Sequence, residues 1–163
     1  MIAPAWVPGM VKQAERDDCY RACVATVLGL ALDDVPNFYR GADKGDGKAP
    51  GALDLIRDWA RERGYAALFL PAQHSLAYVL AQTARLNPEA PFILSGRSKF
   101  GGGHAVVVCH GRIIHEPTPG YGPEDGGVVQ PFADDHFELT CFVPLPPWAR
   151  MSNPPKVVTD FST

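Results

Sequence analysis

The chain has 163 residues, a length typical of one domain that can bury a core without disulfides or metals. Apolar residues make up 46% and charged residues 20%, which excludes a disordered chain, and the net charge of −3 excludes a strongly basic surface for nucleic acid. No apolar run is long enough to span a membrane, and residues 1–10 lack the charged start of a secretory signal. We therefore expect a cytoplasmic protein with no nucleic-acid or membrane partner.

Three helices are predicted from apolar spacing and from start and stop residues: 18–30, 51–63 and 75–86. Asp17 or Asp18 can cap the first helix, and Ser75 can cap the third. Gly64 is a typical stop for the second. The polar, glycine-rich stretches 40–50, 96–103 and 117–127 are expected to be loops.

Six strands are predicted: 65–70, 91–95, 104–109, 112–115, 128–130 and 136–143. The third and fourth of these form a hairpin around His110-Gly111, because both runs are apolar and the break between them is short. Helices followed mostly by strands predict the α+β class, with N-terminal helices packed on an antiparallel sheet. We expect one domain over residues 1–143 and a proline-rich tail over residues 144–163.

Cys19 stands where the first predicted helix begins. A thiolate is favoured at a helix N-terminus and beside a histidine. The preceding Asp17 and Asp18 oppose ionisation, so a histidine from elsewhere in the chain is needed. In a reducing compartment, cysteines are core, catalytic or metal-binding residues rather than a disulfide frame. We interpret Cys23, one helical turn later, as a core residue.

His104 is the strongest candidate for a general base among the five histidines. It follows three glycines, which let the backbone approach a substrate closely, and it begins the strand H-A-V-V-V-C. An antiparallel pair that turns at His110-Gly111 brings residues near 116 opposite residues near 105. We therefore expect Glu116 to lie beside His104 and to orient its ring.

Gln13 lies six residues before Cys19. An acyl intermediate needs hydrogen-bond donors for its oxyanion. The side-chain amide of Gln13 and the backbone N–H of Cys19 are candidates for these two donors.

Three motifs in this order resemble those of papain-like cysteine peptidases, especially the C39-like branch: Q-A-E-R-D-D-C at 13–19, H-A-V-V-V at 104–108 and Glu116-Pro117. In that branch a glutamine precedes the cysteine by six residues, the cysteine opens a buried helix, and the histidine opens a later strand. The likeness covers residues 11–143. Two positions depart from the pattern: Tyr20 stands where glycine is usual, and Glu116 stands where Asp or Asn is usual.

The resemblance implies a papain-like fold and a cysteine hydrolase, a peptidase or isopeptidase that cleaves a peptide or protein substrate without a cofactor or metal. It assigns the four roles as follows: Cys19 the nucleophile, His104 the base, Glu116 the orienting group and Gln13 the oxyanion donor. The same residues also serve a transglutaminase-type acyl transferase. An inactive papain-like binding module is a third possibility.

Each residue also has a simpler interpretation. Cys19 alone is a typical small buried hydrophobe. Taken alone, His104 resembles a structural histidine at a strand edge whose hydrogen bonds are all made. Glu116 alone resembles a solvated turn residue, and Gln13 alone resembles a surface polar residue. A zinc site is disfavoured because the spacing of Cys19 and Cys23 from the later histidines does not match known zinc motifs.

Overall fold

The computed structural model describes residues 9–15, 18–40, 42, 51–99, 101–125, 127–133 and 135–150. Three α-helices lie in these residues: α1 (Cys19–Leu28), α2 (Ala52–Glu62) and α3 (Leu76–Leu86). There are six strands: β1 (Tyr65–Ala72), β2 (Phe92–Ser98), β3 (Gly103–Cys109), β4 (Arg112–His115), β5 (Val128–Gln130) and β6 (Phe137–Pro144). Three 3-10 turns complete the set: η1 (Leu32–Asp34), η2 (Pro123–Asp125) and η3 (Pro147–Arg150). The predicted α+β class is confirmed.

The sheet is antiparallel and has the strand order β1-β6-β2-β3-β4, while β5 pairs with the end of β2. The last strand of the chain, β6, lies between β1 and β2 and pairs with both. The first and last strands of the chain therefore pair with each other in an open sheet. The β2-β3-β4 meander extends from the other side of β6.

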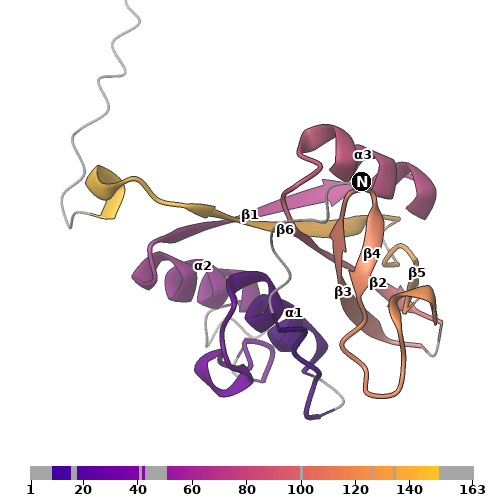
Figure 1. The fold of residues 1–163 in the computed structure, drawn as a ribbon, viewed down its shortest axis with the longest axis horizontal. Coiled ribbons are helices and arrows are strands. Elements are labelled where there is room, and N and C mark those ends of the chain that lie inside the picture. Colours follow the sequence, from indigo (N-terminus) through magenta and orange to yellow (C-terminus); the bar gives the residue numbers. More distant parts are fainter. Residues whose placement is uncertain are drawn as a thin grey trace, which may run out of the picture.

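Helices cover both faces of the sheet (Figure 1). Ile93 and Val107 point to the face packed by α1 and α2, where Tyr20, Val24 and Ile56 are also buried. The alternate residues of the same strands pack on the other face with Val79 of α3. Alternation of side chains along each strand thus produces two cores, and the helices are not confined to one face.

The element boundaries agree with the predicted ones to within about three residues. The largest difference is in β2, which continues to Ser98 because its end pairs with both β3 and β5. The predicted loop over 96–103 is therefore only a turn, closed by a hydrogen bond from the Ser98 N–H to the Gly102 carbonyl (3.0 Å). His110 and Gly111 form the predicted hairpin turn and both have positive φ, 53° and 71°.

One of the two alternative caps predicted for α1 is not observed. Asp18 stands directly before α1, but its side chain accepts no backbone N–H of the helix. Its carboxylate accepts instead from Asn37 Nδ2 (2.8 Å) and from Arg21 (3.3 Å). The Ser75 hydroxyl caps α3 as predicted, accepting from the Tyr78 N–H.

Some predictions lie outside the described residues. These are the alternative cap Asp17, most of the loop 40–50, and the tail beyond residue 150. Within the described ranges, no helix combines the length and apolar character needed to cross a bilayer.

Candidate active site

Cys19 is the first residue of α1, so no carbonyl of the helix accepts its backbone N–H. The thiol is half-buried and lies beside the ring of His104, where hydrogen bonding with Cys19 helps to raise the pKa of that ring. The preceding Asp18 is buried, but Asn37 and Arg21 bind its carboxylate. The negative charge before the thiol is therefore compensated by neighbours that the sequence pattern did not reveal.

His104 links Cys19 to a buried carboxylate. Its Nε2–H donates to Glu116 Oε1 over 2.7 Å, which leaves Nδ1 as the ring nitrogen for the thiol. The backbone N–H of Thr118 donates to the same carboxylate oxygen (2.9 Å). The side chain of His104 is 11% exposed and that of Glu116 only 2%. Thiol, imidazole and carboxylate thus form one hydrogen-bonded series.

A β-bulge lies between β3 and β4. Ile113 lies opposite Val108, and His115 lies opposite Val107. Ile114 is the extra residue between them, and such an insertion shifts the register of all that follows by one.

This shift determines on which face of the sheet Glu116 lies. An unbroken hairpin would set Glu116 opposite Ala105 and therefore on the face opposite to His104. After the bulge, the alternation carried one residue past β4 sets Glu116 opposite Val106, on the face of His104. The proximity expected from the sequence is observed, but a bulge that the sequence argument omitted produces it.

The two partners perturb each other's ionisation. Burial disfavours the charged ring, but hydrogen bonds to Cys19 and Glu116 outweigh it and raise the pKa of His104 from 6.5 to about 9. Burial alone would raise the pKa of Glu116, but hydrogen bonds from His104 and Thr118 lower it below its ordinary value. At neutral pH the pair is therefore an imidazolium beside a carboxylate.

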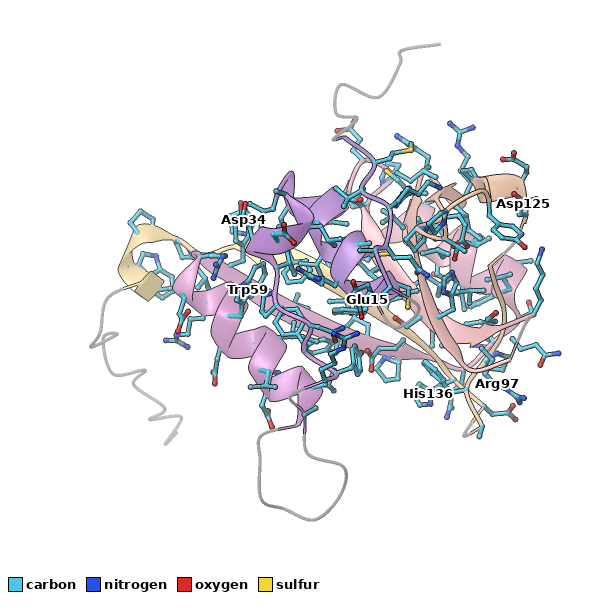
Figure 2. All side chains as sticks on the ribbon, turned by 90° about the horizontal axis from the view of Figure 1, so that it is seen from below. Glu15, Asp34, Trp59, Arg97, Asp125 and His136 are labelled. Atoms are coloured by element: carbon cyan, nitrogen blue, oxygen red, sulfur yellow. The ribbon has the colours of Figure 1, made fainter. Side chains whose placement is uncertain are left out.

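Gln13 lines a pocket of about 510 Å³ together with His104 and Glu116. The far wall includes Asp125, which lies at the end of the molecule opposite to Trp59 (Figure 2). Gln13 Oε1 is buried and has no hydrogen-bond partner among the described residues. A buried amide oxygen without a donor is uncommon, so a ligand N–H in the pocket would improve its hydrogen bonding.

Residues 11–13, here called the strap, hold Gln13 in place. The Val11 N–H donates to Thr26 Oγ1 of α1 (2.9 Å), and the Val11 carbonyl accepts from Nε2 of the buried His115 (2.8 Å). The Gln13 N–H then donates to the Pro117 carbonyl (2.9 Å). The strap therefore connects the helix that carries the thiol to the segment that carries the carboxylate.

Lys12 adds a charged contact to the strap. Its ammonium donates to three carbonyl oxygens, those of Glu116 (2.6 Å), Tyr121 (2.9 Å) and Thr118 (3.4 Å). Such charge-assisted bonds fix the path of the chain directly after Glu116. No pattern in the sequence predicted this role, because a lone lysine is usually solvated.

Gly127 is a second residue that the sequence analysis missed. A Cβ at this position would lie 1.8 Å from Glu116 Oε2 and 2.8 Å from His104 Cδ2. Its φ is not positive, so the glycine provides space rather than an unusual backbone conformation. The glycines at 126 and 127, next to two acidic residues, were interpreted only as part of a loop.

The remaining cysteines and histidines lie elsewhere. Burial raises the pKa of Cys23, Cys109 and Cys141. His115 is a structural residue, because it is buried and its Nε2 donates to the Val11 carbonyl. Among the described residues, no group of three or more His, Cys, Asp or Glu side chains is arranged to hold a metal ion.

Neither protein-family models nor curated proteins match this chain. The chemistry of the site is therefore inferred from its own residues and geometry.

Gly127→Ala should separate Glu116 from His104, because the added methyl group would occupy the position of a carboxylate that is buried and cannot turn into solvent. We expect the pKa of His104, followed by NMR titration, to fall from about 9 towards 6.5. Gly9→Ala is the control, since its Cβ would meet nothing within 4 Å. An unchanged pKa of His104 in the Gly127 variant would contradict this role.

Stability should decrease as the pH rises towards and through 9. The folded pKa of His104 is raised, so its contribution is complete below about 6.5 and is lost as the ring deprotonates near 9. The expected loss is about 1–3 kcal/mol in the free energy of unfolding, measured by urea denaturation between pH 6 and 10. His104→Gln should remove this part of the pH dependence, whereas His110→Gln on the exposed hairpin turn should keep it. Parallel curves for wild type and His104→Gln would contradict the assignment.

Proposed function

We propose that the chain is a cysteine hydrolase, a peptidase or isopeptidase that cleaves an amide bond of a peptide or protein substrate. The observation that carries the proposal is the hydrogen-bonded series from the Cys19 thiol through His104 to the buried Glu116. A cysteine at the start of a helix and a histidine at the start of an antiparallel strand also support a papain-like fold. The proposal includes the cytoplasm as compartment, where the thiol stays reduced.

In the first half-reaction, Cys19 Sγ attacks the substrate carbonyl carbon as a thiolate beside the His104 imidazolium, whose Nδ1 already holds the thiol proton. The carbonyl C–N bond then breaks, and His104 gives that Nδ1 proton to the leaving amine. A thioester between Cys19 and the acyl group remains. Glu116 stabilises the imidazolium throughout by accepting from Nε2.

Water completes the cycle. His104 takes a proton from the water that attacks the thioester carbon, the C–S bond breaks, and Cys19 is restored as the carboxylic acid leaves. Negative charge appears on the carbonyl oxygen in both steps, and the backbone N–H of Cys19 and the amide of Gln13 are the proposed donors. Neither step uses a cofactor or a metal.

Acyl transfer to an amine is the second candidate. The pocket beside His104 has a volume of about 510 Å³ and contains the unpaired acceptor Gln13 Oε1. An acceptor amine would fit there and donate to that oxygen. Added primary amine would then divert the thioester from acid to amide, which mass spectrometry of the products measures.

Alkylation tests the nucleophile. With limiting iodoacetamide at pH 7, intact-mass and peptide mapping should locate the first carbamidomethyl group on Cys19, because burial raises the pKa of the other three thiols. Cys19→Ser should remove the fast phase, and His104→Ala should slow it. First labelling at Cys23, Cys109 or Cys141 would contradict the proposal, and unmodified protein that binds peptides but never cleaves them would favour an inactive binding module.

His104→Ala should reduce kcat/KM for a cleaved peptide by about 10²- to 10⁴-fold, the range for loss of a general acid–base group. Glu116→Gln should reduce it less, because glutamine still accepts from Nε2 but contributes no charge. Circular dichroism controls for folding. Equal losses in the two folded variants would show that the carboxylate does more than orient and stabilise the ring.

A further inference from the structure

A polar row crosses the sheet beside the proposed site. Ala105 on β3, Ser95 on β2 and Glu138 on β6 lie opposite one another in register. They alternate with Leu94 and Leu139, which belong to the α3 core, so the row faces α1. The row is at the end of the sheet where β3 begins, directly after His104.

The two polar side chains of the row have few partners. Ser95 is 6% exposed, and its Oγ makes no hydrogen bond with any residue that the structure describes. Glu138 is half-buried, and its one electrostatic partner among the causes of its pKa shift is His136. Burial raises the pKa of Glu138, and only the charge of His136 opposes this. Buried oxygens without donors are unfavourable, so this row would gain from a ligand that donates hydrogen bonds.

Tyrosines connect this row to the nucleophile. Tyr20 follows Cys19 and donates its hydroxyl to Thr140 Oγ1 (3.0 Å), two residues along β6 from Glu138. The exposed Tyr39 packs edge-on against Tyr20, with ring centroids 5.6 Å apart. Burial raises the pKa of Tyr39, and the charges of both Glu138 and Cys19 help to raise it. Tyr20 and Tyr39 therefore lie between the nucleophile and the strand that carries Glu138.

The spacing fits a peptide substrate. Glu138 is two strands from Ala105, which corresponds to about 10 Å at the usual separation of strands. An extended peptide covers about 3.3 Å per residue, and a lysine or arginine side chain adds further reach. A basic side chain within a few residues of the scissile bond can therefore meet Glu138.

The location also indicates which part of the substrate is involved. The leaving amine has to lie against His104, which protonates it. Glu138 is the second residue of β6, and His136 stands directly before this strand. His136 lies at the same end of the molecule as Arg97 (Figure 2), so Glu138 is near that end. Because β2 separates β6 from the strand of His104, Glu138 lies two strands away from the group that meets the leaving amine, which leaves the acyl part of the substrate as the part to reach it.

We propose that Glu138 and Ser95 bind the ammonium or guanidinium group of a basic side chain in the acyl part of the substrate. The proposal rests on the proposed function and specifies its substrate class. Glu138 provides the charge, and Ser95 Oγ provides a second acceptor. The carboxylate is the specificity-determining group, because an ion held by a partly buried carboxylate is discriminated from an uncharged side chain of equal size.

Matched peptide probes test this substrate class. Each probe is an acetyl tripeptide ending in a chloromethyl ketone, with lysine, norleucine or glutamate at one of the three positions and alanine at the others. Norleucine keeps the length of the side chain and removes the ammonium. The rate of Cys19 modification is measured by intact mass for wild type, Glu138→Gln, Ser95→Ala and Glu138→Lys. Glu62→Gln, on the exposed side of α2, is the control.

At one position, wild type and Glu62→Gln should react about 10- to 100-fold faster with the lysine probe than with the norleucine probe. Glu138→Gln should reduce that ratio to about 3-fold or less, Ser95→Ala should reduce it partly, and Glu138→Lys should favour a glutamate probe instead. Melting temperatures confirm that the variants are folded. Equal lysine and norleucine rates at all three positions, or a preference that persists in folded Glu138→Gln, would overturn this inference alone. Failure of every probe to modify Cys19 would overturn the proposed function and this inference with it.

Discussion

A carboxylate that is 2% exposed must be compensated by charge or hydrogen bonds, and the compensation of Glu116 determines the arrangement of the whole site. His104 and Thr118 bind one carboxylate oxygen, and Gly127 leaves room for the other. The bulge before Glu116 turns the side chain to the correct face of the sheet. Several separate features, distributed over β3, β4 and two loops, are therefore consequences of burying one acid beside one imidazole.

Local chemistry made the elements of the fold predictable. The His110-Gly111 turn, the Ser75 cap and the apolar strands follow from residue types close together in the chain. Two features had no local signal. The position of β6 between β1 and β2 results from pairing with strands far away in sequence. The carboxylate of Asp18 accepts from the side chain of Asn37, which lies 19 residues away, and from that of Arg21 rather than from the backbone N–H groups of the helix.

The candidate site shows the same division. Its principal residues were named from the sequence because thiol, imidazole and carboxylate have recognisable contexts. The residues that position them were not predicted. Lys12 binds backbone carbonyls, and Gly127 contributes only the absence of a side chain, so neither has a recognisable pattern in the sequence. Tyr20, which stands where the resembling family has glycine, is buried, and its hydroxyl is satisfied by Thr140 across the core. The tyrosine ring is therefore packed against the sheet beneath α1 and does not extend over the surface around the thiol.

The strap has a consequence for how the protein is made. Its bond from Lys12 to the Glu116 carbonyl joins residues 104 positions apart, so it cannot form until most of the chain has been synthesised. A nascent chain carries the thiol early, without imidazole, carboxylate or strap. Contacts of such sequence separation are slow to close, and the site is expected to assemble late in folding. An incomplete chain would therefore contain the cysteine but no assembled site.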